Sequence, residues 1–173
     1  YSIFGFWIEY LNTLFDSISN TNHLNLKGLH AHIGSQIFEL DPHKDLGEIM
    51  VNVILDAKKF GHNIKEINVG GGLGIKYTED DDPPSIDEWV KTISLSVVNA
   101  CKKNNLDFPK LLCEPGRSIV STAGLTIYKI GAFKEIPGIR TYLSVDGGMS
   151  DNPRPITYQS NYSACLVGNP LNI

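Results

Sequence analysis

Glu114 and Arg117 are the residues whose types and spacing are best suited to chemistry, and they share one sharp turn, Glu114-Pro115-Gly116-Arg117. The turn closes an apolar run at 111–113 that is typical of a buried strand. In α/β enzymes, ligand chemistry gathers at strand ends of this kind. Two interpretations are open: an ion pair between the two side chains, or a carboxylate and a guanidinium that both contact a bound ligand.

A glycine-rich turn, Gly70-Gly71-Gly72-Leu73-Gly74, ends a second strand-like segment at 64–69. Such a turn lets the backbone approach a ligand closely and offers N–H groups to a phosphate. It lacks the Lys-Ser/Thr pair of a P-loop and the helix and acid of a dinucleotide fingerprint. A strained turn without a ligand is the alternative, but four glycines in five positions favour phosphate binding.

Two histidines, His30 and His32, fall on one face at the end of a third strand-like segment, 24–33, which runs on into Gly34-Ser35. They could bind zinc, pack in the core, or stack on a flat cofactor ring. A zinc site needs further ligands at later strand ends, and no strand-end histidine follows in the sequence. We therefore expect no metal.

Arg154 stands between two prolines, and Tyr158 follows four residues later. A surface loop is one interpretation. The other is an arginine clamp for a carboxylate, with the tyrosine donating to the same group. Together, a phosphate turn, a ring-stacking histidine, an acid and two arginines suggest an enzyme built around a phosphorylated aromatic cofactor. In such an enzyme Glu114 would bind a pyridinium nitrogen and keep the ring able to accept electrons.

The composition is that of a globular protein, with 42% hydrophobic and 20% charged residues in 173 positions. The net charge of −4 and the absence of a basic run argue against nucleic acid and anionic membranes as partners. Three cysteines, Cys101, Cys113 and Cys165, lack metal-type spacing and predict reduced thiols in a cytoplasmic compartment. No apolar run reaches the roughly 18 residues that a transmembrane helix needs.

Helices and strands must alternate to position these motifs. Apolar residues at three- and four-residue spacing predict helices from Phe6 to Ile18, from Asp41 to Phe60 and from Ser85 to Ala100. Strands are predicted at 24–33, 64–69 and 110–114, so the order favours a parallel sheet with crossover helices. Asp41 is expected to cap the second helix ahead of Pro42, and Ser85 has capping-box spacing to Glu88.

The pattern changes after about residue 125. Segments 125–133 and 141–145 are strand-like and flank a Pro137-Gly138 turn with no helix between them. A complete (β/α)₈ barrel needs about 250 residues and eight strands, of which three are present here. We therefore predict the C-terminal part of a TIM-like barrel at 1–125, followed by the start of an antiparallel β domain at 126–173. With no initiator Met, the chain is expected to be part of a longer protein.

The motifs together resemble the fold type III pyridoxal-phosphate decarboxylases, and among them the diaminopimelate decarboxylases. The resemblance runs from about Phe4 to Pro170. The segments that carry it are Gly28-Leu29-His30-Ala31-His32-Ile33-Gly34-Ser35-Gln36, Val69-Gly70-Gly71-Gly72-Leu73-Gly74-Ile75, Glu114-Pro115-Gly116-Arg117-Ser118, and Asp146-Gly147-Gly148-Met149 with Arg154-Pro155 and Tyr158.

This resemblance implies a role for each motif around pyridoxal 5'-phosphate. His32 would stack on the ring, Ser35 and the turn at 70–72 would bind the phosphate, and Glu114 would hold the pyridine nitrogen. The turn of Glu114, Pro115, Gly116 and Arg117 would also touch the phosphate.

The substrate implied is meso-2,6-diaminopimelate, which would lose CO₂ to give L-lysine in the last step of lysine biosynthesis. Arg117 would face this substrate, and Arg154 and Tyr158 would bind its distal amino-carboxylate end. That second carboxylate separates it from ornithine, arginine and lysine.

The chain also departs from the family. The lysine that forms a Schiff base with the cofactor lies upstream in the family, so no catalytic residue is assigned here. Ile3-Phe4-Gly5 stands where the family has Lys-Phe-Gly. The segment alone is expected to show no turnover, and the whole protein is expected to be a cytoplasmic homodimer. Plastid import is also compatible, since a transit peptide would lie upstream.

Three other functions remain open at this point. One is a related decarboxylase acting on carboxynorspermidine or a basic amino acid, which would not need Arg154. Another is a non-catalytic pyridoxal-phosphate-binding protein, against which the strands after residue 125 argue. The last is a zinc barrel hydrolase that uses His30 and His32.

Overall fold

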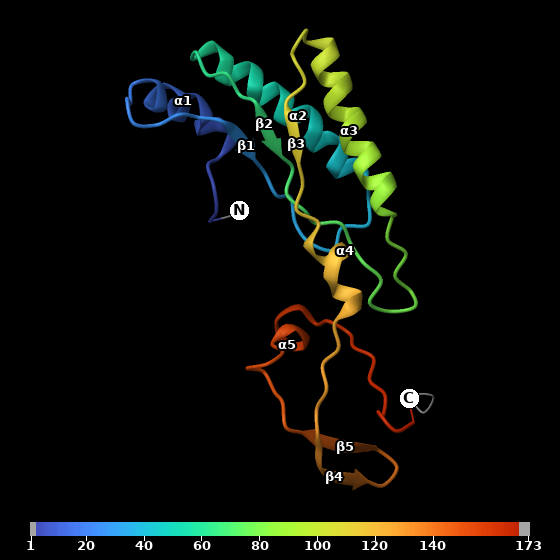
Figure 1. Cartoon of the computed structure of the whole chain (residues 1–173). Helices are drawn as coiled ribbons and strands as arrows, with labels where there is room; N and C mark the ends of the chain where they lie inside the picture. The colour runs from blue at the N-terminus through green and yellow to red at the C-terminus, as the bar shows by residue number, and fades with distance from the viewer. Residues whose placement is uncertain (1–2, 170–173) are drawn as a thin grey trace. The chain divides into compact units, whose positions relative to one another are not determined.

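The computed structural model describes residues 3–169 and divides into two compact units (Figure 1). The first unit comprises the residues up to Ile75 together with Asp82–Ser121. The second comprises the short loop Lys76–Asp81 and the residues from Thr122 onward. The last four residues of the segment 126–173, and Pro170 within the family resemblance, lie outside the described residues.

A three-stranded parallel sheet is the centre of the first unit. Its strands are β1 (Gly28–His30), β2 (Glu66–Asn68) and β3 (Lys110–Leu112), in that spatial order. The predicted parallel pairing is confirmed, whereas the ladder is shorter than the segments 24–33, 64–69 and 110–114. Single backbone bonds continue beyond it, from Ala31 N–H to Asn68 O at 2.9 Å and from Glu114 N–H to Gly70 O at 2.7 Å.

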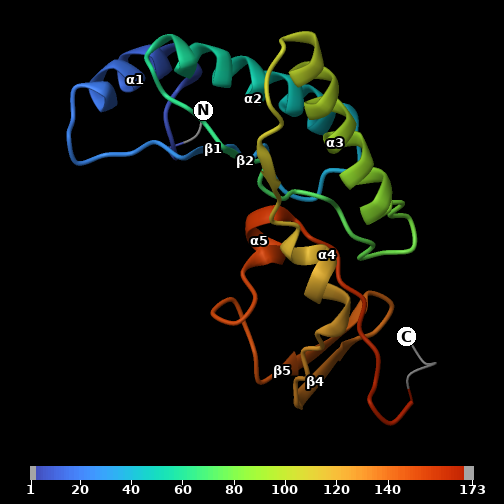
Figure 2. The ribbon, with the colours of Figure 1, turned by 45° about the horizontal axis from the view of Figure 1, so that its top comes forward.

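Two long helices, α2 (Asp41–Lys59) and α3 (Ile86–Lys103), lie side by side and form the core with the sheet (Figures 1 and 2). Most of the apolar residues with helical spacing in these two helices are buried, and these are Leu46, Met50, Val53, Ile54, Ala57, Trp89, Ile93, Val97 and Ala100. Ile49, Ile86 and Val90 have the same apolar spacing but are 41–46% exposed.

His43 is the buried polar residue of this core. It lies on α2 with its ring edge-on to Trp89, the two ring centroids 5.5 Å apart. Burial, and secondly the nearby His32, lower the pKa of His43. The imidazole therefore packs in its neutral form, as part of the core.

The first helix is shorter than predicted. A 3₁₀ turn, η1 (Ile8–Tyr10), leads into α1 (Leu11–Ser19), so Phe6 lies outside the helix and is 68% exposed. Phe15 is the fully buried residue of this segment, and its ring stands 6.1 Å from that of Phe60. The spacing thus located the helix correctly but extended it a turn too far.

The two long helices begin in different ways. Asp41 is the first helical residue of α2, and Leu40 occupies the N-cap without a side-chain bond, so the prediction of Asp41 as cap is wrong. The capping box of α3 is confirmed. Ser85 Oγ accepts from Glu88 N–H at 3.2 Å, and Glu88 Oε2 accepts from Ser85 N–H at 3.0 Å.

We expect Ser85→Ala to lower the free energy of unfolding by about 1 kcal/mol, because the first turn of α3 loses its cap. Urea denaturation at pH 7 would measure the loss. Ser94→Ala, inside the same helix, should be neutral or stabilising because alanine is the better helix former. Equal losses for both variants would contradict the capping argument.

The same cap gives the stability a pH dependence. The backbone N–H of Ser85, followed by its hydroxyl, lowers the pKa of Glu88 from its ordinary value of 4.5. Because the folded value is the lower one, this contribution is present at neutral pH and disappears as the pH falls through the folded pKa.

The second unit contains an antiparallel hairpin, as the two strand-like segments predicted, but its first strand begins at Ile130 and ends at Ile136 and not at 125 and 133. Strands β4 (Ile130–Ile136) and β5 (Arg140–Val145) pair around a turn in which Gly138 has a φ of +74°. A five-residue helix, α5 (Arg154–Tyr158), follows. Within residues 3–169, no helix combines the length and apolarity needed to cross a membrane.

Candidate functional site

Three of the predicted motifs emerge at one edge of the parallel sheet. His32 follows β1, the glycine turn at 70–72 follows β2, and Glu114 follows β3. Because the strands are parallel, their carboxyl ends share this edge, where open α/β sheets bind ligands. The short helix α4 (Gly116–Val120) begins there too and carries Arg117.

The glycine turn packs against its neighbours backbone to backbone. Gly70 and Gly72 have φ values of +68° and +100°, which glycine adopts without strain. A Cβ on Gly70 would stand 2.8 Å from Ala31 O, and one on Gly72 would stand 2.5 Å from Gly34 O. A Cβ on Gly71 would overlap the carbonyl oxygen of Glu114. The glycine turn therefore has no room for side chains, because its backbone packs directly against the loops that follow β1 and β3.

Glu114 lies close to side chains from the other two strands, Asn68 of β2 and His30 of β1. Its Oε1 accepts from Asn68 Nδ2 at 2.7 Å, and its Oε2 lies 3.6 Å from His30 Nε2. Arg117 Nη1 instead donates to Gln36 Oε1 at 3.3 Å. Among residues 3–169, the ion pair between Glu114 and Arg117 that the sequence left open is not formed.

His32 is fixed by the glycine turn. The backbone N–H of Gly71 donates to His32 Nδ1 at 3.2 Å, which places the ring proton on Nε2. The side chain is exposed at the strand edge and is not packed in the core. His30 contacts Glu114, so the two histidines have different partners. In the described part of the chain, no three of His, Cys, Asp and Glu gather as metal ligands.

Ser35 stands in a loop that is bonded to the glycine turn. Ile37 N–H donates to Gly72 O, and Gly74 N–H donates to Ile37 O, both at 2.9 Å. Gln36 has a φ of +59°. Its side-chain amide donates to the carbonyl oxygen of Ile75 and accepts from the backbone N–H of Ile75. These bonds hold the exposed Ser35 beside the glycine turn.

In the second unit, Arg154 and Tyr158 are the first and last residues of α5, one helical turn apart. The Arg154 guanidinium lies 5.4 Å from the centroid of the Tyr77 ring, and its Nη1 donates to Tyr77 Oη at 3.4 Å. This bond, more than the nearby Tyr162 and Tyr158, raises the pKa of Arg154. The arginine is thus a fixed cation on an aromatic platform.

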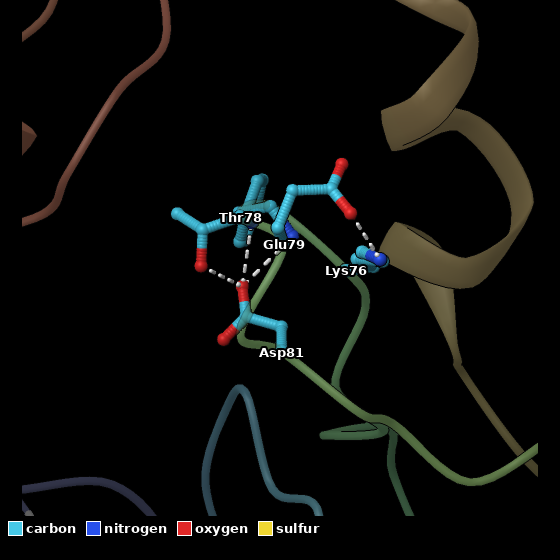
Figure 3. Close-up of polar contacts among 5 residues, drawn as sticks. Lys76, Thr78, Glu79 and Asp81 are labelled. Carbon is cyan, nitrogen blue, oxygen red and sulfur yellow. Dashed lines mark hydrogen bonds and ion pairs between the residues drawn. The ribbon is translucent and has the colours of Figure 1, made fainter.

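Tyr77 belongs to the acidic loop Lys76–Asp81, whose shape Figure 3 shows. Asp81 Oδ2 accepts from the backbone N–H groups of Tyr77 at 2.9 Å and Thr78 at 2.8 Å. These bonds lower the pKa of Asp81, the bond from Thr78 being the larger cause. Lys76 and Glu79 form an ion pair at 2.9 Å. The loop is therefore a tight turn that presents Tyr77 to Arg154.

Comparison with known proteins decides the family. Residues 2–121 match the family model of the pyridoxal-dependent decarboxylases, pyridoxal binding domain. The chain belongs to this family. A diaminopimelate decarboxylase of Synechocystis sp. is 55% identical over 166 residues, which cover 96% of the chain and 35% of that protein. The chain thus spans about a third of the length of such relatives.

Solved structures of the family have the same fold. Diaminopimelate decarboxylase of M. jannaschii superimposes with a TM-score of 0.81 at 30% identity, over 92% of the chain and 36% of that protein. The co-complex of the M. jannaschii enzyme with L-lysine gives a TM-score of 0.73 at 32% identity, over 82% and 32%.

The residues at the sheet edge of this chain fit a pyridoxal group. Glu114 could offer a carboxylate to a ring nitrogen, and the exposed His32 ring is held at Nδ1 by the glycine turn. Two of the three glycine N–H groups already bond within the protein, that of Gly70 to Asn68 and that of Gly71 to His32. A phosphate would therefore depend on the N–H of Gly72 and on the groups of Ser35 and the turn at 114–117.

Three residues that contact predicted site residues escaped the sequence analysis: Asn68 and Gln36 in the first unit, and Tyr77 in the second. The sequence contains a weak indication that Asn68 lies near the site, because Asn68 is two positions before Gly70 and therefore on the same face of its strand. Gln36 stood inside a family segment without an assigned role. Tyr77 lay outside the motifs that the sequence analysis singled out, and its contact with Arg154 spans 77 residues.

Proposed function

We propose that the complete protein decarboxylates meso-2,6-diaminopimelate to L-lysine and CO₂ with pyridoxal 5'-phosphate. Residues 1–125 would form part of a (β/α)₈ barrel that binds the cofactor, and residues 126–173 the start of a β domain. The gathering of His32, the glycine turn and Glu114 at one sheet edge carries the proposal. The identity to diaminopimelate decarboxylases supports the choice of substrate.

Each side chain has a defined task in this function. Bound pyridoxal phosphate supplies an electron sink for the pair left by the departing carboxylate. Glu114 holds a proton at the ring nitrogen, and His32 covers one face of the ring. The N–H of Gly72, the hydroxyl of Ser35 and the turn of Pro115, Gly116 and Arg117 hold the phosphate.

Recognition of the substrate would rest on the arginines. Arg117 faces the reacting end, and Arg154 with Tyr158 binds the distal amino-carboxylate end. Tyr77 holds the Arg154 guanidinium in place, so the clamp needs little reordering when substrate binds. A substrate with a second carboxylate matches such a fixed cation, whereas ornithine and arginine present a cation there.

The experiment that tests this function is CO₂ release by the complete protein with added pyridoxal phosphate. The substrates are meso-diaminopimelate, ornithine, arginine and carboxynorspermidine. We expect release from diaminopimelate. Release from another substrate alone would retain the cofactor site and refute the Arg154 clamp. Cofactor binding without any release would refute the decarboxylase and favour a pyridoxal-phosphate carrier.

Arg154→Ala is expected to raise KM for diaminopimelate about 10- to 100-fold, since one charge-assisted carboxylate contact is lost. Steady-state kinetics of the complete protein would measure it. Arg140→Ala is the matched control, because Arg140 also lies in the second unit against a tyrosine ring, 5.8 Å from the centroid of Tyr142. Unchanged KM in Arg154→Ala would contradict the substrate assignment.

The proposal extends to the state of the protein in the cell. Following the family resemblance, we infer a homodimer with an amino-acid substrate and a cytoplasmic or plastid location. Light scattering of the complete protein should give twice the mass of one chain, and a monomeric mass would refute the dimer.

A further inference from the structure

Asn68 connects two parts of the candidate site through one side-chain amide. It is the last residue of β2 and lies in register between His30 of β1 and Leu112 of β3. Its Oδ1 accepts from the backbone N–H of Gly70 at 2.9 Å, and its Nδ2 donates to Glu114 Oε1 at 2.7 Å. The amide thus joins the glycine turn to the carboxylate.

The two bonds determine the orientation of this amide. Gly70 N–H can only donate, and a carboxylate can only accept. A flipped amide would set the NH₂ group against the N–H of Gly70 and the carbonyl oxygen against Glu114, and both contacts would be repulsive. The observed orientation therefore satisfies both partners and no other orientation does.

Glu114 needs such a partner. Its side chain is 55% exposed, so packing does not restrict its rotamers. The contact of its other oxygen with His30 is 3.6 Å, which is too long for a hydrogen bond. The orientation of the carboxylate therefore depends on Asn68. Functional carboxylates have to be held within a fraction of an ångström of their working position by supporting bonds.

The chemical type of Asn68 matters as well. A lysine or arginine at this position would neutralise Glu114 and weaken its hold on a protonated ring nitrogen. A neutral amide orients the carboxylate and leaves its charge available to the ligand.

We propose that Asn68 is a positioning residue that aims the Glu114 carboxylate at the ring nitrogen of the cofactor and ties it to the glycine turn on the phosphate side. This inference rests on the proposed function. It adds a residue that acts through Glu114 and does not itself touch the cofactor or the substrate.

The test is a double-mutant cycle in the complete protein, with Asn68→Ala, Glu114→Gln and both together. The readouts are the dissociation constant of pyridoxal phosphate by equilibrium dialysis and the ¹⁵N resonance of ring-labelled cofactor in the holoenzyme. Asn68→Ala alone should raise the dissociation constant about tenfold, as expected for loss of a hydrogen bond to a charged group. It should also shift the ring nitrogen toward the unprotonated form.

In the Glu114→Gln background, the same Asn68→Ala change should alter the dissociation constant less than twofold, because the negative carboxylate that Asn68 positions is absent. Asn68→Asp keeps the acceptor for Gly70 N–H and loses the donor to Glu114. It also places a second carboxylate beside Glu114, and the repulsion adds to the loss of the donor, so cofactor binding should weaken. Asn52→Ala, at an exposed position of α2, is the control and should change neither readout.

Each outcome separates the two levels of the argument. If the wild-type protein neither binds pyridoxal phosphate nor releases CO₂, the proposed function fails and takes this inference with it. If the wild type is active but Asn68→Ala and Asn68→Asp match it, the positioning inference alone is refuted. Additive losses in the cycle would show that Asn68 acts on the fold and not through Glu114, which also refutes it.

Discussion

Glu114→Gln is expected to lower kcat for decarboxylation by a factor on the order of 10²–10³, the usual cost of removing one preorganised electrostatic partner. The substitution preserves the size of the side chain and an acceptor for the bond from Asn68. It removes the negative charge that would hold a proton at the ring nitrogen. A ring without that proton accepts electrons poorly, so the loss should fall on kcat and leave KM for substrate within about threefold.

Single-turnover and steady-state kinetics of the complete protein would measure this effect. Glu66→Gln is the matched control, since Glu66 also lies on the sheet and its Oε1 is 3.7 Å from Lys110 Nζ in a largely exposed ion pair. Such surface pairs contribute little to stability, so the control should retain the wild-type rate. A Glu114→Gln enzyme with wild-type kcat would exclude Glu114 as the partner of the ring nitrogen.

Gly71→Ala is expected to weaken cofactor binding and to lower the free energy of unfolding by about 1–3 kcal/mol, the typical cost of overpacking. The added methyl group would overlap the carbonyl oxygen of Glu114, which is backbone and cannot turn aside. The glycine turn or the segment at 114–117 would have to move, and either shift would separate the phosphate side of the site from the ring-nitrogen side.

Equilibrium dialysis with pyridoxal phosphate and urea denaturation would report the two effects separately. Gly168→Ala is the control, because an added Cβ at Gly168 meets nothing within 4 Å. If Gly71→Ala bound the cofactor as tightly as Gly168→Ala, close packing of the turn would have no part in binding.

Local patterns predicted the parts of the fold that depend on local physics. Helical spacing located α2 and α3 because each buries one stripe, and the Ser85–Glu88 spacing predicted a bonded cap. Ile86 and Val90 share the apolar spacing of α3 but are 46% and 41% exposed, since spacing alone does not give the width of the contact that a helix makes. Asp41 shows a similar limit, because a residue type suited to an N-cap also fits the first turn.

The sequence predicted which strand ends share one edge of the sheet, but not which side chains bond there. Alternation and strand order placed His32, the glycine turn and Glu114 at one edge, because parallel strands require it. The amide of Asn68 reaches a carboxylate 46 positions away, and nothing local in the sequence indicates that bond. Arg117 was expected near a phosphate, but its bond to Gln36 spans 81 positions and depends on how two loops meet.

The Tyr77–Arg154 contact has a consequence for co-translational folding. At about 5–20 residues per second, Arg154 emerges about 4–15 s after Tyr77. The described residues of the first unit have all been synthesised once translation reaches Ser121. The loop Lys76–Asp81 belongs to the second unit, whose other residues are synthesised later. The bonds of Asp81 to Tyr77 and Thr78 span three or four positions and need no later residue. These bonds can therefore form as soon as the loop has been synthesised. The loop that carries Tyr77 can fold before Arg154 has been added to the chain.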